Sequence, residues 1–76
     1  MAGPSKEQMR EFLISDIIDY MVSRHVHDFG FTVEQAMDRV YRSETVKRLQ
    51  IPEGELYVQS PDYVLELLIS EQVRKA

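Results

Sequence analysis

The two histidines, His25 and His27, are the side chains of this sequence best suited to metal binding or proton transfer. Imidazole nitrogens bind zinc and related metals, so the pair could form half of a metal site. In a helix, however, residues two positions apart point in directions about 200° apart and cannot both reach one ion. We therefore expect no metal site. We interpret both histidines as surface or boundary residues near a helix C-terminus, where positive charge is favoured.

Other residues that could support catalysis have simpler interpretations. Asp28-Phe29-Gly30 matches the magnesium-binding triplet of protein kinases, but the glycine-rich and catalytic loops of those enzymes are missing. We expect a helix end there, with Phe29 in the core. Nothing in the sequence buries or pairs the carboxylates that could serve as acid and base. We therefore expect solvated helix positions for Asp16, Asp19, Glu66 and Glu71. We predict no catalytic residues, no cofactor, no small-molecule substrate and no enzyme activity.

Apolar residues recur every three or four positions in much of the chain, which predicts amphipathic helices that would position these side chains. A first helix is expected near residues 6–27, because Ser5 and Gln8 have the spacing of a capping box and Gly30 suits a C-cap. A second helix is expected over residues 32–42, again behind a capping-box pair. Its apolar residues are spaced for one face: Val33, Ala36, Met37, Val40 and Tyr41.

The second half of the chain predicts a short helix, a connector and a final helix. Ser43 is a candidate cap for a short helix over Glu44–Leu49. Residues 56–59 have β-type side chains but are too few for a sheet, so we expect an extended connector. Ser60 and Pro61 then favour the start of a C-terminal helix. The predicted fold class is all-α, a small bundle of three main helices and one short helix.

One domain, residues 1–76, accounts for the chain, with residues 1–5 expected to be disordered. The first, second and last helices should supply most of the core, through Leu13, Ile17, Met21, Ala36, Val40, Val46, Leu65 and Leu68. Such a small domain usually gains stability from a disulfide, a metal or a second subunit. Because the 76 residues include no cysteine, we expect self-association or a protein partner.

The composition also bears on location. The absence of cysteine fits a reducing compartment. The sequence shows no secretory signal, and no apolar run approaches the roughly 20 residues needed to span a bilayer. We therefore expect a cytoplasmic protein without membrane contact.

A locally basic segment raises a second possibility, DNA binding. Residues 32–49 could form a helix-turn-helix in which Arg42, Lys47 and Arg48 meet phosphates or bases. Against this, the turn lacks glycine and the net charge of the chain is −4. A helical hairpin with solvated basic residues explains the same pattern.

The connector before the last helix is the candidate protein interface. Tyr57 and Tyr63 flank the Ser60-Pro61 junction, and tyrosine offers a large contact area with a polar tip. The candidate interface residues are Leu56, Tyr57, Val58 and Tyr63. These residues could equally be half-buried in the core.

Residues 43–70 contain a moderately specific pattern: Ser43-Glu44-Thr45, then Leu49, Gly54-Glu55-Leu56-Tyr57 and Ser60-Pro61-Asp62-Tyr63 before a leucine-rich helix. The pattern resembles a group of small uncharacterised bacterial helical proteins. Similar proteins often lie in short operons beside toxin-like or mobile-element genes, so the resemblance implies a partner-binding or antitoxin-like role and transfers no catalytic residue. We predict a non-enzymatic protein-interaction module that acts as a homodimer or small-complex subunit. The alternative is a DNA-binding regulator that uses residues 32–49.

Overall fold

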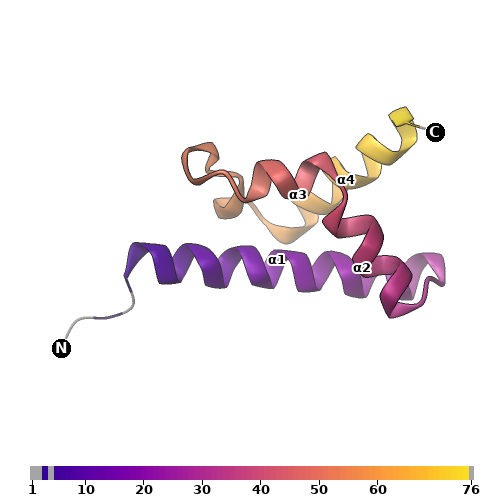
Figure 1. Ribbon diagram of the computed structural model, residues 1–76, viewed down its shortest axis with the longest axis horizontal. Helices are drawn as coiled ribbons and strands as arrows, with labels where there is room; N and C mark the ends of the chain where they lie inside the picture. The colour runs from indigo at the N-terminus through magenta and orange to yellow at the C-terminus, as the bar shows by residue number, and fades with distance from the viewer. Residues whose placement is uncertain (1–2, 4, 76) are drawn as a thin grey trace.

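The computed structural model describes residue 3 and residues 5–75 of the chain. Its described residues form four α-helices and two 3-10 turns without a β-strand, which confirms the predicted all-α class (Figure 1). The elements in order are α1 (Lys6–Phe29), α2 (Val33–Tyr41), α3 (Glu44–Leu49), η1 (Pro52–Gly54), η2 (Leu56–Val58) and α4 (Pro61–Lys75). No helix in this part of the chain is both long and apolar enough to cross a membrane.

The start and the end of α1 follow the predicted capping chemistry. Gln8 donates its backbone N–H to the Ser5 hydroxyl at 3.1 Å, and the Gln8 side chain accepts from the Ser5 N–H at 2.9 Å. Gly30 follows the helix with φ of 71°, a left-handed conformation that glycine adopts cheaply. The predicted disorder of residues 1–5 falls largely outside the described residues, although Ser5 is described and forms the N-cap of α1.

Polar side chains also set the boundaries of α2 and α3. Thr32 and Gln35 form a second reciprocal capping box at the start of α2. The buried Ser43 hydroxyl accepts from the Val46 N–H at 3.1 Å and donates to the Val40 carbonyl at 2.6 Å. Ser43 therefore starts α3 and ties it to the end of α2, so the turn between them needs no glycine.

The connector differs from its predicted extended form. Residues 52–58 wind into two successive 3-10 turns, with Glu55 between them at φ of 52°. No strand lies alongside to accept backbone hydrogen bonds, so the segment satisfies its own: Gly54 N–H donates to Ile51 O at 3.1 Å and Val58 N–H to Glu55 O at 3.2 Å. The turns also point Leu56 into the core, where only 8% of it is exposed.

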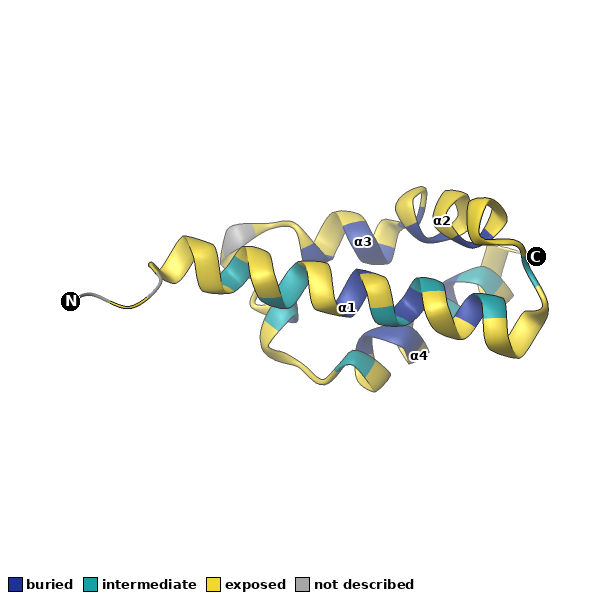
Figure 2. Ribbon diagram, turned by 90° about the horizontal axis from the view of Figure 1, so that it is seen from below, coloured by how far each residue is buried: buried dark blue, intermediate teal, exposed yellow. Residues whose placement is uncertain are grey.

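The molecule is elongated, 47 × 22 × 18 Å, because α1 runs along its whole length (Figure 1). α2 and α4 pack on α1, and α3 packs on α4. The first turns of α1 project beyond the other helices (Figure 2), so Leu13, an expected core residue, is only partly buried. The other predicted core residues are buried, and Ile18, Leu49, Leu56 and Val64 join them.

Candidate functional site

An apolar stripe on α2 remains uncovered by the rest of the fold. Ala36 and Val40 turn toward the core and are fully buried. Val33, Met37 and Tyr41 follow one another at four-residue intervals, so they form a continuous row beside that buried face. Their exposed fractions are 57%, 43% and 51%. Half of the apolar face of α2 therefore faces solvent.

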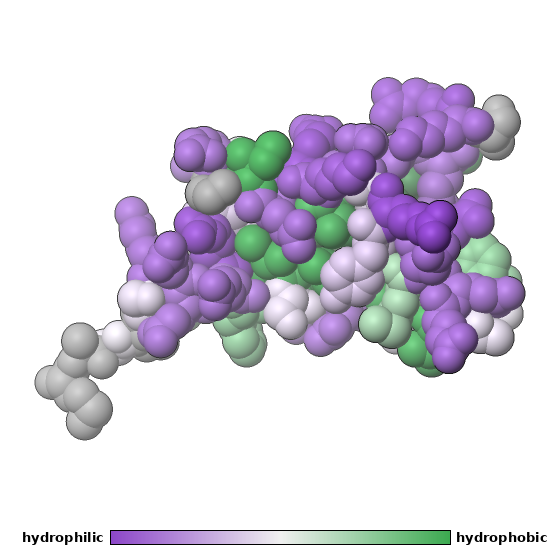
Figure 3. Space-filling view, in the orientation of Figure 1, coloured by the Kyte–Doolittle hydropathy of each residue, from purple (hydrophilic) through white to green (hydrophobic). Residues whose placement is uncertain are grey.

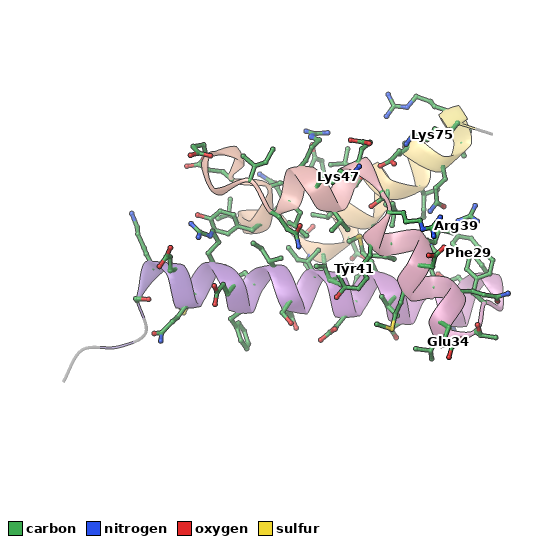
Figure 4. The ribbon with its side chains drawn as sticks, in the orientation of Figure 1. Phe29, Glu34, Arg39, Tyr41, Lys47 and Lys75 are labelled. Carbon is green, nitrogen blue, oxygen red and sulfur yellow. The ribbon has the colours of Figure 1, made fainter. Side chains whose placement is uncertain are left out.

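A matching row on α1 forms the second wall of a groove. Ile18, Val22 and Val26 are also four residues apart, and burial decreases from Ile18, which lies in the core, to Val22 and Val26, which are partly buried. Together the two rows enclose a groove of about 510 Å³. Hydrophobic side chains reach the surface where α2 crosses α1 (Figure 3). Tyr41 lies over the middle of α1 at one end of this row (Figure 4).

The edge of this groove on α1 is polar. Asp19, Ser23 and His27 line it, again at four-residue intervals. All three side chains are exposed. The groove thus has an apolar floor and a polar border, as protein interfaces commonly do.

The two histidines lie in opposite environments, which excludes a shared metal ion. His25 is fully buried, and its Nδ1 lies 2.8 Å from the Met21 carbonyl oxygen. Because a carbonyl oxygen only accepts, Nδ1 carries the proton in this contact. The side chain of His27 is 82% exposed. Within the described residues, no three His, Cys, Asp or Glu side chains gather closely enough to hold a metal.

The interpretation of His25 as a surface or boundary residue was therefore wrong. It follows Ile17 and Met21 at four-residue steps, so it belongs to the buried row of α1. Its Nε2 is buried without a hydrogen-bond partner among the described residues. The ring packs edge-on against Phe29, with centroids 5.2 Å apart, and stacks on Phe31 at 6.0 Å. His25 is a core residue of an aromatic cluster.

Phe29 is not in the core, contrary to expectation. It is 49% exposed, because it is the last residue of α1 and only one side of its ring meets His25 and Phe31. The interpretation of residues 28–30 as a helix end is confirmed by the C-cap at Gly30. The Arg39 guanidinium lies over the Phe31 ring, 5.2 Å from the ring centroid.

The expectation that Glu71 is a solvated helix residue is wrong, because its side chain is buried and hydrogen-bonded. It accepts from the Glu44 N–H at 2.9 Å, the Thr45 N–H at 2.8 Å and the Thr45 hydroxyl at 2.7 Å. Burial by itself raises the pKa of Glu71, but these hydrogen bonds and one from Lys75 outweigh it and lower the pKa to about 2. Asp16, Asp19 and Glu66 are exposed, as expected. Glu71 therefore caps α3 from α4 as a fixed anion.

Two of the three basic residues proposed to meet DNA form ion pairs with their own helices. Arg42 pairs with Asp38 at 2.8 Å and Lys47 with Glu44 at 3.3 Å. Arg42 and Arg48 line two neighbouring grooves that share Glu71 and Lys75, and α3 has only six residues. Lys47 lies on the side of α3 away from α1 (Figure 4). DNA contact through residues 32–49 stays a prediction, and the geometry gives it no added support.

The four predicted interface residues of the connector divide between core and surface. Leu56 is buried and Tyr57 is half-buried against the core, so Leu56 offers no surface to a partner. Val58 and Tyr63 are 59% and 47% exposed. Neither lines the groove between α1 and α2, which the sequence reasoning did not single out.

Comparison with known proteins finds no family model, no curated protein and no solved structure that matches this chain. The resemblance of residues 43–70 to small bacterial helical proteins therefore stays a prediction. The function has to be argued from the groove itself.

Proposed function

We propose that this chain is a non-enzymatic protein-interaction module that holds a partner in the groove between α1 and α2. The observation that carries the proposal is the exposed row of Val33, Met37 and Tyr41 beside a second apolar row on α1. Contiguous exposed apolar surface with a polar border is typical of interaction sites. Met and Tyr are also common anchors at protein interfaces, because Met adapts its shape and Tyr adds a large rigid ring.

The energetics require a partner that covers both walls. Fully burying an apolar side chain is worth about 1.5–3 kcal/mol, so the three half-exposed residues of α2 offer about 1 kcal/mol each. Association itself costs at least about 4 kcal/mol. The row on α2 alone would not hold a partner. An occupant must therefore also contact Val22 and Val26 on α1 and the polar border.

The shape of the groove favours a macromolecule over a small ligand. Small-molecule sites typically bury about 70–90% of their ligand. Here Val33 and Tyr41, two of the wall residues, are themselves more than half exposed. Such open walls cannot surround a small molecule, whereas a protein segment can lie along them and be covered on its other side by its own domain.

The resemblance to operon-partner proteins suits a subunit of a small complex. A cysteine-free chain suits a reducing compartment, and we place its action in the cytoplasm. A second copy of the chain and a different protein are both possible occupants under this proposal.

Site-specific photo-crosslinking in the native host tests the proposal. Benzoylphenylalanine would replace Tyr41 in the groove or, as a matched control, Tyr63, which is exposed to a similar degree outside it. We expect a discrete protein adduct from position 41 and a much weaker one from position 63. Equal adducts from both positions, or adducts from position 63 alone, would show that the groove is not the interaction site.

A further inference from the structure

Carboxylates border the groove on both walls. On α1, Asp19 lines the groove, and Asp16 lies two turns before Ser23 on the same side of the helix. On α2, Glu34 and Asp38 each follow a groove residue by one position. At about 100° per residue, this places them on the solvent side of the apolar row. All four are exposed, and Glu34 lies at the outer end of α2 (Figure 4).

Most of this negative charge is uncompensated. Asp38 pairs with Arg42 at 2.8 Å. Asp16, Asp19 and Glu34 form no ion pair with any residue that the structure describes. His27 is a basic side chain at the groove edge, and its Nδ1 lies 3.3 Å from an Asp28 carboxylate oxygen. A ligand that places cations on both sides of its apolar anchors would therefore complement this border.

The dimensions of the groove fit a short helix. From Val33 to Tyr41 the row rises eight residues along α2, or about 12 Å, a little more than two helical turns. An amphipathic helix lying in such a groove presents anchors at i, i+3 or i+4 and i+7, one per turn. Two to three turns of a partner helix would thus place an anchor near each of Val33, Met37 and Tyr41.

A second copy of this chain is a poorer match for the same border. One exposed apolar helical segment that a second copy could offer, outside the groove, is the start of α1, with Met9 and Phe12. There Arg10 already pairs with Glu7 at 3.6 Å, and Glu11 balances Lys6. The whole chain carries a net charge of −4, so self-docking would bring negative charge to negative charge.

We infer that the groove binds an amphipathic helix of a different protein, with lysine or arginine flanking its apolar face. This inference rests on the proposed function and adds the chemistry of the partner. The helix lies with its apolar anchors between the α1 and α2 rows. Its cations lie against Asp16 and Asp19 on one side and Glu34 on the other.

Two synthetic helical peptides of about 14 residues, or four turns, test the inference. Both carry the same leucine row, and one has lysine and the other glutamate at the flanking positions. Titration into the ¹⁵N-labelled chain should show saturable amide shifts in residues 18–27 and 33–41 with the lysine peptide. The glutamate peptide should bind at least about tenfold more weakly, with the difference shrinking in high salt.

Charge-neutralising variants give the matched control. Asp19→Asn combined with Glu34→Gln should weaken binding of the lysine peptide about tenfold. Each substitution removes up to one exposed ion pair with a lysine of the peptide. Glu53→Gln combined with Glu66→Gln removes the same charge from exposed positions that do not line the groove and should leave the affinity unchanged.

The outcomes separate this inference from the proposed function. Equal binding of both peptides in the groove would overturn the basic-partner inference but leave the groove as an interaction site. Concentration-dependent shifts of the groove amides without any peptide would show that a second copy is the occupant, which also overturns the inference. Amide shifts that spread over acidic residues outside the groove would mean that the lysine peptide binds by nonspecific electrostatic attraction. This result would also overturn the inference. Failure of the proposed function would instead appear in the crosslinking experiment, which uses no peptide.

Discussion

Replacing Glu71 by glutamine should strongly destabilise the domain, although it changes only one side-chain atom. The Glu71 carboxylate on α4 accepts three hydrogen bonds from the start of α3, two of them from backbone N–H groups of Glu44 and Thr45. These N–H groups belong to the first turn of α3 and have no partner within the helix. In Glu71→Gln, an NH₂ group replaces one of the two carboxylate oxygens. Because NH₂ cannot accept a hydrogen bond, at least one of the donors on Glu44 and Thr45 loses its acceptor.

The pKa gives the magnitude. The pKa of Glu71 falls from 4.5 to about 2 on folding. A difference of about 2.5 units is worth about 3 kcal/mol of unfolding free energy, at about 1.36 kcal/mol per unit. Because the folded-state pKa is the lower one, this contribution is complete above pH 4.5 and is lost as the pH falls through 2. In a domain of this size about 3 kcal/mol corresponds to a Tm change of about 12–24 °C.

Thermal and urea unfolding followed by circular dichroism would measure this difference. Glu71→Gln should lower the Tm by more than about 10 °C at pH 7, while Glu66→Gln on the exposed side of the same helix should change stability by less than about 0.5 kcal/mol. The difference in Tm between the native chain and Glu71→Gln should become smaller as the pH falls from 5 to 2. A Tm for Glu71→Gln close to the native value, or a gap independent of pH, would refute the reasoning.

Two further substitutions test the core and the contact between α1 and α4. His25→Ala should lower the free energy of unfolding by about 2–4 kcal/mol, because it leaves a cavity in the aromatic cluster. His27→Ala should change the free energy of unfolding by less than about 0.5 kcal/mol. Equal effects of the two substitutions in urea unfolding would contradict the burial of His25. The hydrogen bond from Tyr20 to Asp62, together with desolvation, raises the pKa of Tyr20. The resulting stability is present below pH 10 and lost above it. Tyr20→Phe should remove this part of the Tm decrease above pH 10, and an unchanged alkaline profile would argue against the bond.

The helices could be predicted from the sequence because their signals are local. Ser5, Thr32 and Ser43 cap helices through residues three positions later, and Gly30 ends α1 through its own backbone. Such patterns need no knowledge of the rest of the fold. The 3-10 turns of the connector were not predicted, because residues 56–58 have the β-type side chains of a strand. Their backbone conformation is set by the burial of Leu56 in the core and not by pairing with another strand.

His25 and Glu71, two of the buried polar residues, differ in how far the sequence indicates their burial. His25 had a usable signal, since it continues the row of Ile17 and Met21, but its residue type suggested the surface. Glu71 had none, because its partners lie 26 and 27 positions away and meet it only when α3 packs on α4.

The groove could be predicted only in part. The sequence places Val33, Met37 and Tyr41 on the same broad apolar face as Ala36 and Val40. It does not show which half of that face α1 covers, because the crossing of α2 over α1 decides that. The sequence instead suggested Val58 of the connector and Tyr63 of α4 as interface residues, because of their β-type and aromatic side chains.

The effect of Met37→Glu on the crosslink from position 41 tests the central claim most directly. Met37 is the middle residue of the exposed row on α2, and Val73 on α4 is an exposed apolar residue that does not line the groove. The adduct should disappear in Met37→Glu and persist in Val73→Glu, with both variants folded by circular dichroism. Persistence of the same adduct in Met37→Glu would contradict binding through the groove between α1 and α2.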